Sequence, residues 1–544
     1  MSPAGREMLP IRFLQAGRGR YVASCNHLPT AGGMIVPEKE SLPSYNSCFQ
    51  GGIMNDEPGK TQEQKKEEAK QKKRRLLGLE PVETRHALDL PGGRLPYVAR
   101  AGVLPLRDEF DELEAEVFFT AYELEGVPDR SARPLTFLFN GGPGSASIWL
   151  HLGAAGPYRA RMEDEGWMPK PPYELTPNEF TWLGFSDLVF VDPVGTGYSR
   201  AVREELDRKF WSFNGDIESV GEFIRLYLGR YGRWESPLFL AGESYGTTRS
   251  AGLAGHLVEK GMAFNGIVLI STALDIRPID FGIGDDLPYQ LFVPTYAATA
   301  RYHGRLEPDL QGLSLEELDR MVTEWSGREL AVALAQGDGL PPERRSQIAA
   351  QLARFTGLAQ EYVEGSNLRV EINRFCRELL RDEKRSVGRL DSRFKGIEAL
   401  ATGEYPESDP AMDAMTPPYV SMLYAHLGGR LGVRTDMPYE PLNLKANEKW
   451  EWERGKLPTT GEILRKAMAK NPHMKVMVAQ GYYDLATPCY ATSYMLSHMN
   501  MDPSLRGNVS TRYYEAGHMF YLDLESLAAF HGDVAGFFGE ACRS

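Results

Sequence analysis

Residues 237–246 read Pro-Leu-Phe-Leu-Ala-Gly-Glu-Ser-Tyr-Gly, and the rest of the chain is organised around this stretch. A short apolar run of strand type ends in Gly-x-Ser-x-Gly, and residues 247–260 after it are predicted to form a helix. In a strand, sharp turn and helix of this kind, the turn lifts the hydroxyl of Ser244 out of the sheet, and glycines avoid side-chain clashes. The alternative is an ordinary strand-to-helix turn that happens to contain glycine and serine, so the remaining sequence has to decide.

Composition and charge limit the classes of protein to which the chain can belong. Of its 544 residues, 42% are hydrophobic and 25% are charged, which is typical of a globular protein. A net charge of −13 argues against a nucleic-acid partner, because phosphate binding needs clustered positive charge. The sequence has no run of about eighteen apolar residues, so no membrane span is predicted.

No metal and no cofactor are predicted. The five cysteines are scattered and include no Cys-x-x-Cys pair, which argues against a zinc cluster and against a disulfide framework. They are Cys25, Cys48, Cys376, Cys489 and Cys542. The first residues lack the apolar core of a secretory signal, so a cytoplasmic location is expected, with Met54 as an alternative start. The sequence does not fix the oligomeric state.

Residues 1–80 are expected to be a disordered, charged extension. Residues 60–75 are rich in Lys, Glu, Gln and Arg and have no apolar face. A basic arm that binds nucleic acid is the alternative interpretation of this run.

Residues 81–274 are expected to form the first part of a mostly parallel sheet. The first two predicted strands are antiparallel, with turn signals between them at Pro105 and 108–111. The later strands alternate with helical stretches, which predicts a parallel sheet whose functional loops lie beyond the carboxyl ends of its strands. The predicted strands are residues 95–101, 116–124, 134–140, 187–192 and 265–271, together with the run before Ser244.

A helical cap is predicted at 275–455, and 456–544 are expected to complete the sheet domain. Apolar residues recur at helical spacing in the cap, which predicts helices at 315–336, 342–358 and 367–384. Strand-type sequence resumes at 474–481 and 509–514, and an amphipathic helix is predicted at 523–538. The predicted buried side of that helix carries Leu524, Leu527, Ala528, Val534 and Phe538.

Three residues follow the order Ser, acid, His in which an α/β-hydrolase presents its catalytic triad. They are Ser244, Asp484 and His518, each expected at the carboxyl end of a strand. Asp275, which follows another strand, is a competing candidate for the acid. His473 and His531 lie before a strand and within a helix, so they are interpreted as structural or surface residues.

Backbone amides at two places are predicted to form an oxyanion hole. One is the N–H of Tyr245, the residue after the candidate nucleophile, and the other is the N–H of Gly142, in the glycine-dense loop that follows the strand at 134–140. This loop is no phosphate loop, because no Gly-Lys-Ser/Thr follows it. Four segments thus converge on one site, which makes a chance match at 242–246 much less plausible.

Six motifs together resemble the signature set of the serine carboxypeptidase family. The match covers about residues 134–274 and 474–520, with a helical insertion between them, as that family has. The motifs are Asn-Gly-Gly-Pro-Gly at 140–144, Asn-Glu-Phe-Thr-Trp at 178–182, Asp-Pro-Val-Gly-Thr-Gly-Tyr-Ser at 192–199, Gly-Glu-Ser-Tyr-Gly at 242–246, Gly-Tyr-Tyr-Asp at 481–484 and Ala-Gly-His at 516–518.

The resemblance implies that the C-terminal residue of a peptide is removed through an acyl-enzyme. It also implies that Asn140, Gly141 and Glu243 hold the terminal carboxylate of the substrate. A carboxylate can approach Glu243 only if one of the two acids is protonated, which would favour acidic pH. The alternative for Glu243 is a side chain turned inward to satisfy the backbone of the turn.

Two departures from the family pattern stand out. Ala154 occupies the position at which many members carry a second glutamate, so the implied acid pair would be incomplete. Ser145 stands where the family often has a disulfide-forming cysteine, which fits a reducing compartment or a bacterial-type member.

Other functions on the same fold remain open at this point. An enzyme similar to prolyl aminopeptidase also uses Gly-Gly-Pro-Gly after a strand, and an esterase or acyltransferase would share the fold. An inactive hydrolase that serves as a binding protein is a further alternative.

Overall fold

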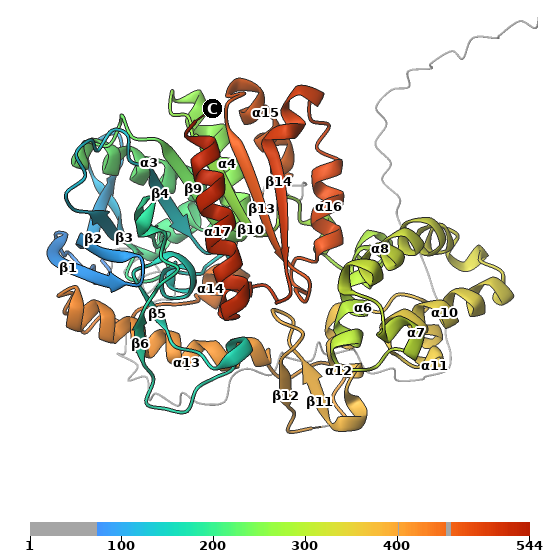
Figure 1. Cartoon of the computed structure of the whole chain (residues 1–544). Coiled ribbons are helices and arrows are strands. Elements are labelled where there is room, and N and C mark those ends of the chain that lie inside the picture. Colours follow the sequence, from blue (N-terminus) through green and yellow to red (C-terminus); the bar gives the residue numbers. More distant parts are fainter. Residues whose placement is uncertain (1–72, 401, 453–458, 544) are drawn as a thin grey trace, which may run out of the picture. The chain divides into compact units, whose positions relative to one another are not determined.

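A computed structural model describes residues 73–400, 402–452 and 459–543. Most of the predicted N-terminal extension, residues 1–72, therefore lies outside the described residues. The described part is built on one large sheet with the strand order β1-β2-β3-β7-β4-β9-β10-β13-β14, and β8 pairs with β3 (Figure 1). The strands of this sheet are β1 Val82–Leu90, β2 Gly93–Arg107, β3 Leu113–Leu124, β4 Leu135–Phe139, β7 Asp187–Val191, β8 Arg200–Ala201, β9 Leu238–Ser244, β10 Gly266–Thr272, β13 Lys475–Gly481 and β14 Val509–Tyr514.

The pairing of the strands changes once across the sheet, from antiparallel to parallel. β1, β2 and β3 pair antiparallel, and β3 is also antiparallel to β7. From β7 onward all neighbours are parallel. This order and these directions are those of an α/β-hydrolase fold, so the predicted fold class is confirmed. The carboxyl ends of six parallel strands meet at one edge, where the predicted site residues are expected.

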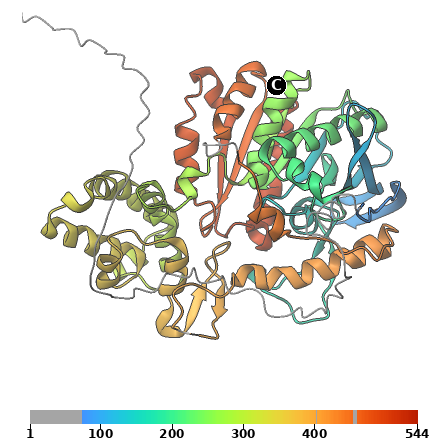
Figure 2. The same ribbon diagram turned by 180° about the vertical axis from the view of Figure 1, so that it is seen from behind.

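Both faces of the sheet are buried, which explains why its central strands read as continuous apolar runs. Alternate residues of one strand point to opposite faces: Phe137 and Phe139 of β4 belong to one core, and Leu138 belongs to the other. The core that contains Leu138 is covered by α17, whereas α3, α4, α15 and α16 cover the opposite face (Figures 1 and 2).

The helices of the described chain flank the sheet or lie between β10 and β13. They are α2 Asp207–Phe210, α3 Phe213–Tyr231, α4 Tyr245–Glu259, α5 Leu287–Leu291, α6 Val293–Tyr302, α7 Pro308–Gln311, α8 Leu315–Trp325, α9 Ala331–Ala335, α10 Pro342–Thr356, α11 Gln360–Gly365, α12 Ile372–Glu378, α13 Pro410–Ala425, α14 Leu444–Glu448, α15 Thr460–Lys470, α16 Cys489–Ser497 and α17 Leu524–Ala541. Two small hairpins are separate from the sheet, β5 Tyr158–Ala160 with β6 Leu175–Pro177 and β11 Arg385–Val387 with β12 Lys395–Ile397.

The segment between β10 and β13 has a hydrophobic core of its own. Helices α6, α8, α9, α10 and α12 pack around it, beside the strands of the sheet (Figure 1). Leu485, which lies in the loop after β13, is fully buried in this same core. The helical segment is therefore packed directly against the loop that carries Asp484.

Several elements differ from the sequence-based predictions. Pro105 lies inside β2 and not in a turn, because β1 pairs only with residues up to Ala101 and leaves the N–H side of Pro105 without a partner strand. The predicted helix at 367–384 is confirmed only for Ile372–Glu378, where α12 lies, and residues 367–371 before it are not helical. Leu524, predicted to be buried, is 47% exposed, and Phe530 takes the inward position on α17.

A buried cluster of charges fastens β7 to the segments beside it. Asp187, at the start of β7, accepts hydrogen bonds from Arg133 Nε and from Arg233 Nη1, each at 2.6 Å. Arg233 is 1% exposed and Arg133 is 9% exposed. Two guanidinium groups therefore share a single carboxylate away from solvent, with Glu123 3.8 Å from Arg233 as a further anion.

Replacing Asp187 with alanine should destabilise the protein by about 3–5 kcal/mol, because it leaves two buried cations without their main partner. The midpoint of chemical denaturation, followed by circular dichroism, measures the effect. Glu222→Ala is the matched control: it removes the exposed pair with Arg225, and we expect a loss below about 1 kcal/mol. Equal effects of the two variants would contradict this account of the cluster.

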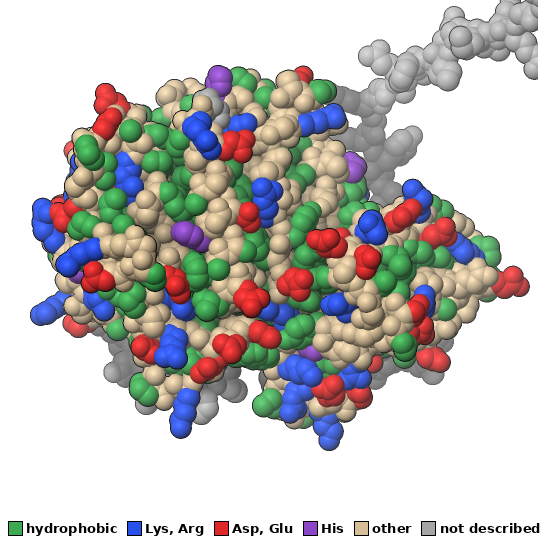
Figure 3. Space-filling model, in the orientation of Figure 1, with side chains coloured by type: hydrophobic (Ala, Val, Ile, Leu, Met, Phe, Trp, Pro, Cys, Tyr) green, Lys and Arg blue, Asp and Glu red, His purple; other side chains and the backbone are tan. Residues whose placement is uncertain are grey.

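Charged side chains of both signs are interspersed on the face of the molecule shown in Figure 3. Among the described residues, no helix has the length and apolar character needed to cross a membrane. The three cysteines in the described part, Cys376, Cys489 and Cys542, are free thiols.

Candidate active site

Ser244 sits at a strained turn between β9 and α4. Its backbone has φ 59° and ψ −126°, a conformation that L-residues with side chains rarely adopt and that costs of the order of 1–3 kcal/mol. A Cβ added to Gly242 would lie 2.1 Å from the carbonyl oxygen of Gly246, so only glycine fits there. The turn therefore raises the serine side chain above the sheet at the N-terminus of α4, where unpaired backbone N–H groups favour negative charge.

The loop after β4 is held against the start of α4. Arg249 of α4 is fully buried and donates from Nη1 to the backbone carbonyl of Asn140 at 2.8 Å. The same guanidinium donates from Nε to Asp216 of α3, also at 2.8 Å. This ion pair fixes the loop that carries Asn140, Gly141 and Gly142 beside Ser244.

His518 and Asp484 are paired although they lie in different loops. Nδ1 of His518 is 2.8 Å from Oδ2 of Asp484, and both side chains are buried. The other oxygen of Asp484, Oδ1, accepts hydrogen bonds from the backbone N–H groups of Ala486 and Thr487 at 2.8 and 2.9 Å. The Thr487 hydroxyl donates to Oδ2 at 2.6 Å. The carboxylate is thus held rigidly with one oxygen directed at the imidazole.

The charges of this pair reinforce one another. Burial disfavours the ionised form of Asp484. The charge of His518 and the hydrogen bonds that the carboxylate accepts outweigh this effect and bring the pKa of Asp484 below its usual value. Burial likewise disfavours the imidazolium, yet the charge and hydrogen bond of Asp484 leave the pKa of His518 above its usual value. Because an ionised Asp484 can only accept, Nδ1 of His518 carries a proton and Nε2 of the neutral ring is free to accept one.

The loop of His518 is also held by the segment between β11 and β12. The backbone N–H of His518 donates to the carbonyl of Leu390 at 2.6 Å, and that of Gly517 donates to Asp391 at 3.0 Å. On the other side, the hydroxyl of Ser271, at the end of β10, donates to the His518 carbonyl at 2.5 Å. The imidazole is therefore positioned by the sheet and by the helical segment together.

Ser244 and His518 line one cavity of about 220 Å³ at the carboxyl edge of the sheet. Neither the Ser244 hydroxyl nor Nε2 of His518 forms a hydrogen bond with a described residue, which leaves both groups available. Arg389 brings a cation to the same cavity. The remaining lining residues are Asn140, Gly141, Gly142, Ser145, Trp149, Glu243, Leu390, Met412, Leu442, Leu444, Asn447 and Met519.

Glu243 is a buried acid at one wall of this cavity. Oε1 accepts from Nδ2 of Asn140 at 2.8 Å, and Oε2 accepts from the hydroxyl of Tyr521 at 2.5 Å. Burial raises the pKa of Glu243 to about 7, in spite of the opposing effects of His518 and of these two donors. The side chain thus lies beside Ser244 in a form that can gain a proton near neutral pH.

The structure brings the predicted site residues together and separates the competing ones. Asp275 lies in another cavity, beside Leu274 and Thr459, and makes no bond with a described histidine. His531 lies on α17.

Three residues of the site, Thr487, Arg389 and Tyr521, were not predicted from the sequence. Thr487 follows Asp484 by three residues and Tyr521 follows His518 by three, but no spacing rule would single out either.

The segment 98–273 matches the model of a protein family described as "Serine carboxypeptidase". Among curated proteins, the chain is 30% identical over 158 residues to the pheromone-processing carboxypeptidase KEX1 of Saccharomyces cerevisiae, which covers 27% of this chain and 20% of that protein. It is 30% identical over 231 residues to the pheromone-processing carboxypeptidase kex1 of Aspergillus niger, covering 40% and 35%. The chain thus spans about a fifth to a third of the length of these relatives.

A crystal structure of Kex1Δp, a prohormone-processing carboxypeptidase from Saccharomyces cerevisiae, aligns with a TM-score of 0.47 and 18% identity, over 81% of this chain and 91% of that one. The family match covers β3, β4, β7, β9 and β10, the strands that carry Asn140 and Ser244. The expected likeness to bacterial-type members stays a prediction. Residues 98–273, which carry Asn140 and Ser244, are thus similar to the serine carboxypeptidase family.

Proposed function

We propose that this protein is a serine-type carboxypeptidase that releases the C-terminal residue of a peptide through an acyl-enzyme on Ser244. The observation that carries the proposal is that Ser244 and His518 share one small cavity with the buried pair Asn140–Glu243. The first two groups suit acyl transfer, and the last two suit recognition of a carboxylate. The match of residues 98–273 to the serine carboxypeptidase family supports the same function.

In the proposed mechanism, Nε2 of His518 takes the proton of the Ser244 hydroxyl as Oγ attacks the scissile carbonyl carbon. Asp484 holds the imidazole by Nδ1 and stabilises the imidazolium that forms. The oxyanion would accept hydrogen bonds from the backbone N–H groups of Gly142 and Tyr245. His518 then gives its proton to the leaving amine, and water, activated by the same imidazole, hydrolyses the acyl-enzyme.

In the same cavity, Asn140, Gly141 and Glu243 would bind the terminal carboxylate of the substrate. An anionic substrate and an ionised Glu243 would repel each other in a site of low dielectric. A protonated Glu243 instead donates a hydrogen bond to the incoming carboxylate. Only the last peptide bond would then lie above Ser244, which restricts cleavage to the C-terminal residue.

The direct test is to compare dipeptides blocked at either end. A carboxypeptidase cleaves an N-blocked dipeptide with a free carboxylate and not a C-amidated one with a free amine. An enzyme similar to prolyl aminopeptidase shows the reverse preference, and an esterase or acyltransferase turns over esters without cleaving peptides. Mass spectrometry of the products from one peptide of known sequence then shows whether residues leave one at a time from the C-terminus.

We expect the pH dependence to differ between substrates with and without a free carboxylate. Above pH about 7 Glu243 loses its proton, so kcat/KM for an N-blocked dipeptide should fall, by up to tenfold per pH unit. An ester of the same acyl group needs no carboxylate recognition, so its kcat/KM should stay level over that range. Both should decline at low pH as His518 becomes protonated. Parallel profiles for the two substrates above pH 7 would contradict the role of Glu243.

A further inference from the structure

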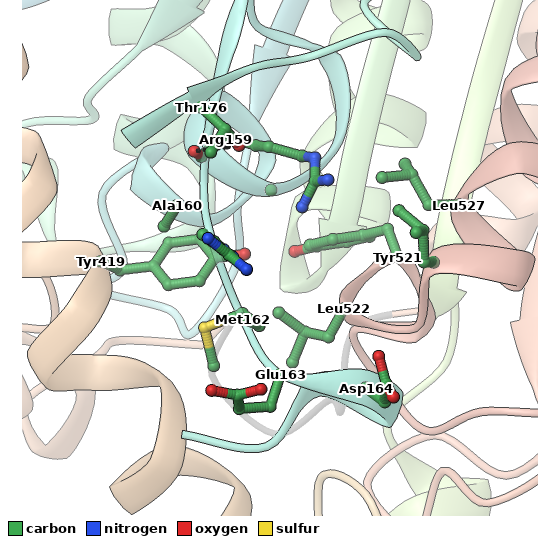
Figure 4. A pocket seen from close by; sticks show the side chains of 13 residues that line it. Arg159, Ala160, Met162, Glu163, Asp164, Thr176, Tyr419, Tyr521, Leu522 and Leu527 are labelled. Carbon is green, nitrogen blue, oxygen red and sulfur yellow. Dashed lines mark hydrogen bonds between the residues drawn. The ribbon is translucent and has the colours of Figure 1, made fainter. Parts of the chain in front are cut away.

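Tyr521 lies between two cavities, and its hydroxyl is bonded to the acid that we place in the carboxylate site. The residue is 2% exposed and belongs to a single helical turn, Phe520–Leu522, that follows the loop of His518. Its ring lines a second cavity of about 260 Å³, which Tyr419 of α13 enters from the opposite side (Figure 4). Its hydroxyl donates to Oε2 of Glu243, which lines the cavity of Ser244.

The space for the phenol is provided by small residues in the helical turn Leu150–Ala155. A Cβ on Gly153 would lie 2.7 Å from Cε2 of Tyr521 and 2.5 Å from the hydroxyl of Tyr419. The next residue, Ala154, carries only a methyl group and brings no second acid towards Glu243. Two tyrosines from distant segments therefore lie against Gly153 and line the second cavity with it.

The described polar groups that act on Glu243 come from five segments. They are Asn140 after β4, Asp484 in the loop after β13, His518 in the loop after β14, Tyr521 of the turn Phe520–Leu522 and Tyr419 of α13. Of these, Asn140 and Tyr521 donate hydrogen bonds to the carboxyl group, one to each oxygen. Burial and the charge of Glu243 raise the pKa of Tyr521 above its usual value, so the phenol keeps its proton and remains a donor.

We propose that Tyr521 is a specificity-determining positioning residue, whose hydroxyl holds the carboxyl group of Glu243 where it meets the terminal carboxylate of a peptide substrate. This inference rests on the proposed function. With both oxygens of Glu243 fixed by neutral donors, the site contains one ionisable acid, and its orientation does not depend on a second carboxyl group. Tyr521 would thus affect substrates with a free carboxylate and leave the chemistry at Ser244 unchanged.

The test is the Tyr521→Phe variant, which removes one oxygen atom and keeps the ring. We expect KM for an N-blocked dipeptide with a free carboxylate to rise by up to about tenfold, the size of one lost hydrogen bond between neutral groups, because Glu243 is protonated when it binds the substrate. We expect kcat/KM for the ester of the same acyl group to stay within about twofold of the wild type. Ester turnover also shows that the variant is folded.

Tyr419→Phe is the matched control, because this hydroxyl lines the second cavity and forms no hydrogen bond with a described residue. We expect it to leave both substrates unchanged. The pH profile gives a readout that loss of packing would not move. Without the donor of Tyr521 the carboxylate form of Glu243 is less stable, so the decline of free-acid turnover at high pH should shift to higher pH in Tyr521→Phe and not in Tyr419→Phe.

The outcomes separate this inference from the proposed function. If the wild type releases C-terminal residues and Tyr521→Phe behaves like Tyr419→Phe, the role of Tyr521 is overturned and the carboxypeptidase assignment stands. Equal losses on ester and free acid would also overturn it, because they would indicate a general structural effect. If the wild type releases no C-terminal residue, the proposed function fails and this inference fails with it.

Discussion

Ser244→Ala should lower kcat for peptide hydrolysis about 10⁶-fold, the largest effect that we expect from any single substitution. The hydroxyl is the only nucleophile in the proposed mechanism, and no neighbouring serine can replace it, because the turn directs residue 244 alone above the sheet. Purified wild type and variant, incubated with one N-blocked dipeptide and followed by release of the C-terminal amino acid, give the measurement.

A covalent label provides an independent readout of the same residue. A fluorophosphonate probe should modify the wild type at Ser244 and leave the Ser244→Ala variant unlabelled. Ser145→Ala is the matched control: this serine lines the same cavity, but its hydroxyl contacts the indole of Trp149 and backbone carbonyls and has no base beside it. Turnover by Ser244→Ala close to that of the wild type would contradict the proposed mechanism. A wild type that is not labelled would indicate an inactive hydrolase.

The fold could be predicted from the sequence because its signals are local. The central strands are apolar runs buried on both faces, and a polar residue directly follows β4 and β7, at Asn140 and Asp192. The order Ser244, Asp484, His518 along the chain then sufficed to predict one catalytic site, because the carboxyl ends of parallel strands lie at the same edge of the sheet. The sequence also favoured Asp484 over Asp275 as the acid, and the structure pairs Asp484 with His518.

Other features depend on contacts between distant segments and left no local signal. The helix predicted at 367–384 from the spacing of its apolar residues is limited to Ile372–Glu378, and the chain then turns into β11, which pairs with Lys395–Ile397, because strand partners outweigh weak helical propensity. The contact of Tyr521 with Glu243 joins residues 278 positions apart, and it requires a glycine at 153, where a Cβ would lie 2.7 Å from the ring of Tyr521. The spacing of apolar residues and short motifs describe neighbours in sequence, so they give no information about such a contact.

Asp484→Asn should lower kcat about 10⁴-fold, even though the substitution is nearly isosteric. The reason lies in the hydrogen bonds around the side chain. Oδ1 accepts two backbone N–H groups, from Ala486 and Thr487, so the amide of an asparagine would place its oxygen there and direct its NH₂ group at His518. A donor facing Nδ1 forces the other tautomer of the imidazole, in which Nε2 carries the proton and cannot accept one from Ser244.

The matched control for Asp484→Asn is Asp275→Asn, which changes the competing acid, a half-buried side chain in a separate cavity. We expect Asp275→Asn to retain wild-type kcat, and Asp484→Asn to react with a fluorophosphonate far more slowly while unfolding at nearly the same denaturant concentration. The rate of labelling isolates the attack by Ser244 from substrate binding, because the probe has no terminal carboxylate. If Asp275→Asn proved to be the inactive variant, the imidazole would have to leave the position in which Leu390 and Ser271 hold its backbone, and the geometry of the whole site would be wrong.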